Sequence, residues 1–135
     1  MVFFEIISSF LFGALGYGTL ELFWRGHTHW SMLLTGGTCF SLIYFVATRS
    51  KEALWKKWVM SAALITTLEF LVGCIVNLRL GWDVWDYSGE KYNLLGQICP
   101  LFSFLWFLLC IPCTAFSKAC NRFFFKKSNI KPSCQ

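Results

Sequence analysis

Charged residues are scarce in this chain of 135 residues, at 14% of the total, whereas 56% of the residues are hydrophobic and 19% are aromatic. A soluble domain carries roughly 25% charged residues, so a chain this apolar cannot cover a folded surface in water. Its length also allows only one domain. The composition therefore excludes a soluble globular protein and predicts a single small helical bundle in lipid.

Three signatures that would indicate other classes are also missing. The first apolar run carries Glu5 where a signal peptide would be basic, and no small-residue cleavage site follows it, so we interpret this run as a membrane span. The seven cysteines are odd in number and lie mostly inside apolar runs, which is typical of packing residues and not of a disulfide framework. No soluble basic face accompanies the net charge of +5, so we expect no nucleic-acid partner.

Four apolar stretches are long enough to cross about 30 Å of hydrocarbon as helices. They lie at about residues 2–23, 30–47, 58–78 and 98–117. Uninterrupted runs of this length are helical, because in lipid every backbone hydrogen bond must be made within the protein. We therefore predict an all-α fold, in which residues 1–118 form a polytopic four-transmembrane-helix bundle with an outer loop or lid between the third and fourth helices. Within the second stretch, the glycines of the segment 36–38 favour close helix packing.

Basic residues gather on one side of the predicted spans. Nine of them flank the second, third and fourth spans on that side, and only Arg25, Arg79 and Lys91 lie on the other. The positive-inside rule therefore predicts an integral membrane protein, in the cell membrane, with both termini in the cytoplasm. Residues 119–135 form a basic tail that we expect to contact anionic lipid of the inner leaflet.

Two acidic residues lie inside predicted spans. Glu69 follows Trp58 by eleven residues, which places its carboxyl group roughly 16 Å into the third span. Such a group costs several kcal/mol unless it is paired or neutral. Asn77 lies eight residues further on the same helix face, so we expect this polar stripe to point into the bundle. Glu21 repeats the pattern near the outer end of the first span, and each acid fits either a structural clasp or a site for a ligand, ion or proton.

Further polar side chains share the outer side with these acids. They are Arg25, His27 and His29 in the turn after the first span, and Asp86, Tyr87, Ser88, Asn93 and Gln97 in or beside the segment that follows the third. Imidazoles with a carboxylate fit a divalent metal ion, whereas Arg25 with backbone amides at a helix start fits an anion. An interfacial cap with solvated histidines explains the turn equally well. The concentration on one side is the strongest indication of a binding site.

Several segments carry a resemblance to a known family. They are GYGTLELFWRGHTHWSM from Gly16, LEFLVGCIVN from Leu68, WDVWDYS from Trp82 and NLLGQICPLFSFLW from Asn93. In these motifs the chain resembles the putative ABC-transporter permease, type IV (CmpB-like) family of small four-helix membrane proteins. The resemblance implies that the chain is a transport protein. Tyr17, Glu21, Glu69, Trp85, Asp86, Tyr87, Ser88 and Asn93 are the positions that fit the family pattern. The chain has no GxxxxGK[ST] motif, so an ATPase would be a separate polypeptide.

Three functions remain open on the sequence. A transport-related, permease-like subunit would use the outer acids, Arg and His as a polar binding site, and would need a homo-oligomer or a partner subunit, because four helices rarely enclose a pore. A metal-assisted membrane enzyme would act at the outer leaflet on a lipid-linked substrate, with His27 or His29 near a carboxylate. A non-catalytic subunit would bind membrane lipids or act as a scaffold. We favour the transport-related subunit, because intramembrane acids are typical of transport pathways.

Overall fold

The computed structural model describes residues 2–125 of the chain. Its elements are α1 (Val2–Arg25), α2 (Trp30–Arg49), α3 (Leu54–Gly73), η1 (Cys74–Arg79), α4 (Pro100–Cys120) and η2 (Asn121–Phe125). Within residues 2–125, four helices are long and apolar enough to cross a membrane, which confirms the predicted four-helix membrane bundle. The three tail lysines at positions 126, 127 and 131 lie outside the described residues.

The ends of the helices differ somewhat from the predicted spans. α3 begins at Leu54, four residues before the predicted start, so its first turn carries Lys56 and Lys57. At its other end the helix widens into the π-helical turn η1, after which the Leu80 amide donates to the Ile75 carbonyl oxygen over 3.0 Å. α4 likewise extends through η2 to Phe125. The hydropathy pattern located the helices but not the polar turns that lengthen them.

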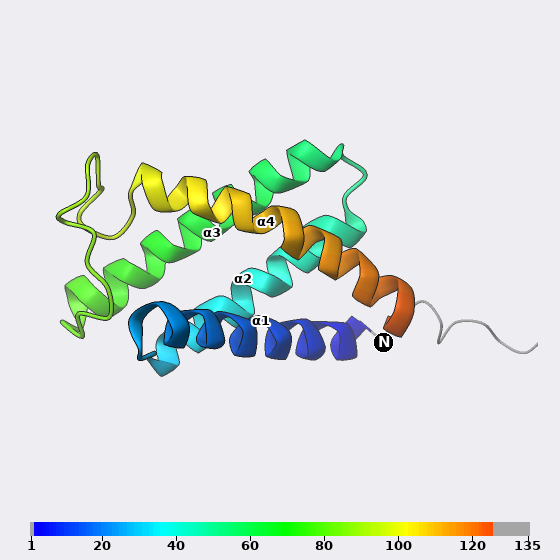
Figure 1. The fold of residues 1–135 in the computed structure, drawn as a ribbon, viewed down its shortest axis with the longest axis horizontal. Helices are drawn as coiled ribbons and strands as arrows, with labels where there is room; N and C mark the ends of the chain where they lie inside the picture. The colour runs from blue at the N-terminus through cyan, green and yellow to red at the C-terminus, as the bar shows by residue number, and fades with distance from the viewer. Residues whose placement is uncertain (1, 126–135) are drawn as a thin grey trace, which may run out of the picture.

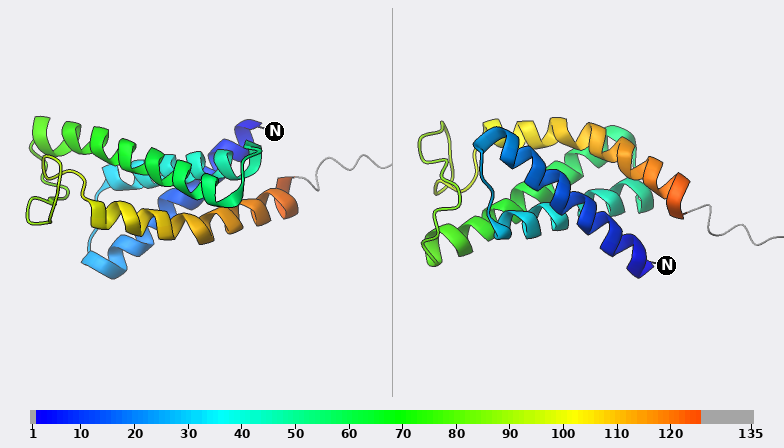
Figure 2. Two further views of the ribbon diagram at one scale, coloured as in Figure 1. Left: turned by 90° about the horizontal axis from the view of Figure 1, so that it is seen from above. Right: turned by 60° about the horizontal axis from the view of Figure 1, so that its bottom comes forward.

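The helices form two hairpins, α1–α2 and α3–α4, whose turns lie at the same end of the bundle (Figure 1). The α1–α2 turn and the Leu80–Cys99 loop lie at one end, which we call the loop end, and the α2–α3 connection lies at the other, together with the start of α1. α1 runs obliquely to α3 and α4 (Figure 2). α1 packs along α2, whereas α4 packs against both α2 and α3.

Glycines allow α1 and α2 to approach closely. A Cβ atom added at Gly13 would lie 2.7 Å from the Gly36 carbonyl oxygen, and one added at Gly36 would lie 2.5 Å from the Tyr17 Cβ atom. Only a residue without a side chain fits at such a distance. The prediction that the glycines of α2 allow close helix packing is confirmed, and Gly13 is their partner on α1.

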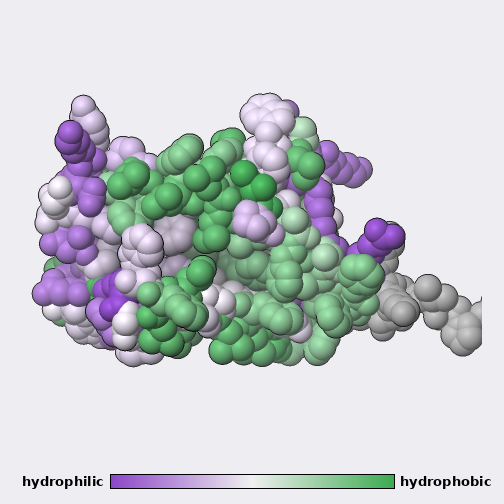
Figure 3. All heavy atoms as spheres, viewed as in Figure 1, coloured by the Kyte–Doolittle hydropathy of each residue, from purple (hydrophilic) through white to green (hydrophobic). Residues whose placement is uncertain are grey.

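The surface of the bundle is apolar along the helices and polar at the ends (Figure 3). Large side chains such as Leu15, Leu71 and Phe104 are more than half exposed. Exposed apolar side chains need no covering when the surrounding solvent is lipid. The loop end carries most of the remaining polar groups, and the candidate site lies there.

Candidate functional site

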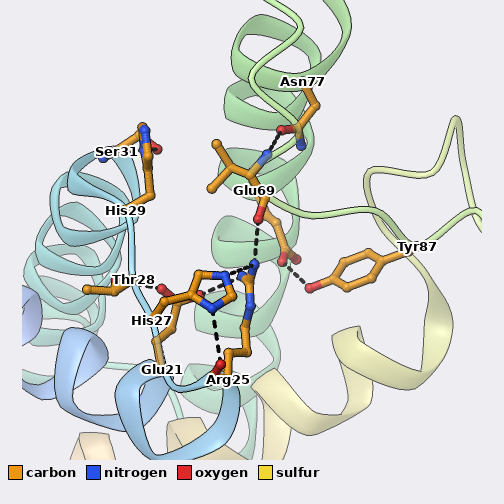
Figure 4. Close-up of polar contacts among 10 residues, drawn as sticks. Glu21, Arg25, His27, Thr28, His29, Ser31, Glu69, Asn77 and Tyr87 are labelled. Atoms are coloured by element: carbon orange, nitrogen blue, oxygen red, sulfur yellow. Dashed lines mark hydrogen bonds and ion pairs between the residues drawn. The ribbon is translucent and has the colours of Figure 1, made fainter.

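Arg25 connects the first helix to the loop between α3 and α4 (Figure 4). It lies in the last turn of α1, four residues after Glu21, where its Nη1 atom donates to Glu21 Oε1 over 3.0 Å. Its Nη2 atom donates to the Val84 carbonyl oxygen over 2.7 Å. Thr28 donates to the other Glu21 oxygen over 2.7 Å. Both oxygens of this buried carboxylate are therefore bonded, and its charge is balanced by one guanidinium.

The two histidines make separate local contacts (Figure 4). His27 lies beside Arg25, with Nδ1 3.1 Å from the Arg25 carbonyl oxygen. His29 is the N-cap of α2, where its Nδ1 atom accepts from the Ser31 amide over 3.3 Å and lies 2.7 Å from the Ser31 hydroxyl oxygen. Across residues 2–125, no group of three or more His, Cys, Asp or Glu side chains could hold a metal ion. His29 therefore caps α2 and is half-buried, whereas His27 is exposed beside Arg25.

Asn77 and Gln97 join the Leu80–Cys99 loop to the end of α3. Asn77 accepts from the Val84 amide over 2.7 Å and donates to Gln97 Oε1 over 2.8 Å. Gln97 in turn accepts from Trp85 Nε1 over 3.0 Å through its backbone carbonyl. Gly73 makes room for this packing, because a Cβ atom there would lie 2.9 Å from the Trp85 ring. Asn77 and Gln97 are buried and hold the loop in place.

Asp86, Ser88 and Asn93 shape the tip of the loop. The backbone amide and the hydroxyl of Ser88 donate to the two Asp86 oxygens, each over 2.8 Å. These bonds, the amide first, lower the pKa of the Asp86 carboxyl below its usual value. Asn93 donates to the Glu90 carbonyl over 2.8 Å and accepts from the Gly96 amide over 3.0 Å. Ser88 and Asn93 thus stabilise the turn itself, and they leave Asp86 ionised.

Glu69 bridges α3, the loop and α4. Its Oε1 atom accepts from the Tyr87 hydroxyl over 3.0 Å, and its Oε2 atom accepts from Trp106 Nε1 over 2.8 Å. Glu69 is 4% exposed, so the prediction that its stripe points inward is confirmed. Burial, and then the charge of Glu69, raise the pKa of Tyr87 above its usual range, so its hydroxyl remains a donor. Glu69 and Glu21 therefore have separate hydrogen-bond partners.

Two adjoining cavities lie between α1 and α4, and we call them together the α1–α4 groove. The outer cavity, of about 470 Å³, lies at the loop end. The inner cavity, of about 540 Å³, extends along the helices. Both volumes are within the range of small-molecule sites. The two share five lining residues: Tyr17, Leu20, Met32, Trp106 and Leu109.

The lining of the groove changes along its length. Three charged residues line the outer cavity, and they are Glu21, Arg25 and Asp86. Six aromatic residues also line it: Tyr17, Trp24, Trp85, Tyr87, Phe102 and Trp106. The inner cavity is mostly apolar, and its one acidic lining residue is Glu69. Six of the predicted site residues line neither cavity: His27, His29, Asn77, Ser88, Asn93 and Gln97.

Three aromatic residues of the groove were not among the predicted site residues: Trp24, Phe102 and Trp106. Phe102, Trp106, Leu109 and Cys113 recur at intervals of three or four residues, so they share one face of α4. This periodicity was available in the sequence. It does not distinguish a cavity wall from an ordinary packing face, because both need the same apolar stripe.

One family model matches most of the chain. Residues 31–132 match the family described as "Putative ABC-transporter type IV". The chain belongs to this family. No curated protein and no solved structure matches the chain. The type IV match agrees with the resemblance seen in the sequence, and it covers α2, α3, the loop and α4.

The type IV match also divides the candidate site. Asp86, Tyr87 and Trp106 lie within the matched residues, whereas Glu21 and Arg25 on α1 lie before them. The groove is therefore built from one wall that the type IV family model covers and one wall that it does not.

Proposed function

We propose that this chain is a transport-related membrane subunit whose α1–α4 groove binds an amphipathic molecule drawn from the bilayer. One observation carries the proposal: a continuous groove inside a membrane bundle is apolar along most of its length and charged at one end. Such a groove matches a molecule with an apolar tail and a polar head. The type IV family supports the transport role.

The position of α1 supports entry from the side. α1 packs along α2, and the cavities occupy the space between α1 and α4. Both helices face hydrocarbon, since Leu15 on α1 and Phe104 on α4 are more than half exposed. A lipid tail can therefore leave the bilayer for the groove without crossing water.

Transport itself requires more than this chain. Four helices rarely enclose a pore, so we propose assembly with a further copy or with a separate membrane or ATPase subunit. We also propose that both termini are cytoplasmic, because nine of the twelve basic residues in the sequence flank the other side of the spans, and only Arg25, Arg79 and Lys91 fall on the side of the loop end. The charged end of the groove would then face the outer leaflet.

Gly16 offers a direct test of the groove. It lines the inner cavity, and a Cβ atom there would meet no heavy atom within 4 Å. Gly16→Phe should therefore fill the cavity without disturbing α2, while Gly16→Ala leaves it open and serves as the matched control. We expect native mass spectrometry from a mild detergent to show co-purified lipid on the wild type and on Gly16→Ala, and little on Gly16→Phe. Equal lipid on all three proteins would contradict the proposal.

A lipid-binding scaffold is the second candidate, and the clasp at Glu69 favours it. Both Glu69 oxygens are bonded to fixed donors, which suits a rigid bundle better than a moving one. Reconstitution in liposomes distinguishes the two functions. Transbilayer movement of a fluorescent lipid that Gly16→Phe abolishes would support transport, and binding without movement, in the presence of the partner subunit, would support the scaffold.

A further inference from the structure

The outer cavity combines aromatic walls with an excess of negative charge. Six of its thirteen lining residues are aromatic, and its charged residues are two carboxylates and one guanidinium. Aromatic faces attract cations, and quaternary ammonium groups are the ligands most often bound by such walls. This combination favours a ligand with a cationic headgroup.

Only one of the two carboxylates in the outer cavity is paired with a basic side chain. Arg25 is paired with Glu21, and its second terminal nitrogen already donates to the Val84 carbonyl oxygen. The Asp86 carboxylate has no basic partner within residues 2–125, and its contacts there are with Ser88. An anion entering the cavity would compete with Glu21 for Arg25 and would meet Asp86 unshielded. A cation would find Asp86 available.

Hydrogen bonds and stacking fix the aromatic walls in position. Glu69 holds the hydroxyl of Tyr87 and the indole nitrogen of Trp106. The Tyr87 ring stacks on Phe102 with centroids 4.5 Å apart, and the Tyr17 and Trp106 rings lie 6.0 Å apart. Rings held in this way lose little conformational entropy when a cation binds, so ordering them offsets little of the attraction.

We infer that the outer cavity binds an alkylammonium headgroup of the choline type, with the tail of the same molecule in the inner cavity. This inference rests on the proposed function of the groove. Asp86 supplies the opposite charge, and the aromatic walls supply contact with the alkyl groups of the cation. The cation can belong to a zwitterionic phospholipid or to a single-chain cationic amphiphile.

Ligands with one tail and different heads test the inference. Full-length protein in maltoside detergent is titrated with lysophosphatidylcholine, with lysophosphatidylglycerol of the same tail, and with an alkyltrimethylammonium salt of similar length, and occupancy is measured by native mass spectrometry. We expect the choline lipid to bind roughly tenfold more tightly than the glycerol lipid. Alkyltrimethylammonium binding at the same site would identify a cationic amphiphile as sufficient, whereas binding of the choline lipid alone would identify a phospholipid.

Two pairs of variants locate the headgroup. Asp86→Asn keeps an acceptor for the Ser88 amide and removes the charge, and Asp83→Asn is its matched control in the same loop, outside the cavity lining. Trp24→Leu removes a ring that is 84% exposed, and Trp30→Leu does the same for a ring that does not line the cavity. We expect Asp86→Asn and Trp24→Leu each to reduce the choline preference about threefold to tenfold, and both controls to keep it.

The outcomes separate the headgroup from the groove. Equal or tighter binding of lysophosphatidylglycerol to the wild type would overturn the alkylammonium inference and leave the groove intact. An unchanged choline preference in both Asp86→Asn and Trp24→Leu would also overturn it. Failure of all three ligands to bind, with the same result for Gly16→Ala and Gly16→Phe, would instead contradict the proposed function.

Discussion

Two neighbouring glycines of α1 show how one helix can be both a packing element and a cavity wall. Toward α2, Gly13 lies so close to Gly36 that a Cβ atom would meet a backbone oxygen at 2.7 Å. Only three residues later, Gly16 borders the inner cavity and has nothing within 4 Å of its Cβ position. The same residue type thus permits close contact at one position and leaves open space at the next position on that face. Glycine in a membrane helix is therefore not by itself a sign of close packing.

A larger side chain at Gly13 should have the largest effect on stability. Gly13→Leu forces a side chain against the backbone of α2, which cannot move aside as a side chain can. We expect the free energy of unfolding to fall by about 1–3 kcal/mol or more, measured by denaturant titration in detergent. Gly16→Leu is the matched control, because a Cβ atom there meets nothing within 4 Å. A similar loss in both variants would remove the contrast between the two positions.

Weakening the hydrogen bonds that Glu69 accepts should have the next largest effect on stability. Glu69→Gln replaces one of two acceptor oxygens with a donor that faces either Tyr87 or Trp106. Hydrogen bonds inside membrane bundles average about 0.6 kcal/mol, with a maximum near 1.7, so we expect a loss of about 1 kcal/mol and retained lipid binding. Glu52→Gln, in an exposed pair with Lys56, is the control. Loss of co-purified lipid without loss of stability would instead make Glu69 a ligand contact.

Removing a single hydroxyl should have a smaller effect. Tyr87→Phe keeps the ring that stacks on Phe102 and deletes only the hydrogen bond to Glu69. We expect a loss of about 0.6 kcal/mol, detected as a small decrease in the melting temperature in detergent. A change as large as that of Glu69→Gln would mean that loss of the Tyr87 hydrogen bond accounts for the whole effect of Glu69→Gln.

Acid should have the smallest effect, confined to the loop tip and the outer cavity. The pKa of Asp86 is lowered in the folded chain, so its contribution is complete above the unfolded value of about 3.9 and is lost as pH falls through the folded value. We expect the choline preference to be constant from pH 7 to about pH 4 and to decline only below that range. Headgroup titrations across this range provide the measurement, and a decline near neutral pH would exclude Asp86 as the charged partner.

Much of the fold could be predicted because, in lipid, the backbone hydrogen bonds of each apolar run must be made within its own helix. The four spans, the small residues of α2 and the inward face of Glu69 all follow from local pattern and from the cost of a polar group in lipid. The partners of Glu69 could not be predicted in this way. Tyr87 and Trp106 lie 18 and 37 residues away, and only the crossing of α3 and α4 brings them to one carboxylate.

The candidate site was predicted less well than the fold. The concentration of polar residues at one end was visible in the sequence, but their division into roles was not. Asn77 and Gln97 bind each other and the loop, whereas Asp86 lines the cavity. Which polar side chain faces another polar group and which faces open space depends on backbone turns such as η1 and the loop tip. Residue type and spacing leave those turns undetermined.

The sequence by itself determined that this protein lies in a lipid bilayer, how many spans it has and at which end its polar groups collect. These properties depend on the free energies of transfer from water to lipid, which add up along the chain. Only the tertiary structure decided that α1 packs on α2 and leaves a groove beside α4. The reason is physical. In lipid, apolar surface gains nothing by leaving the solvent, so close packing and hydrogen bonds between helices select which helix faces meet and which stay apart.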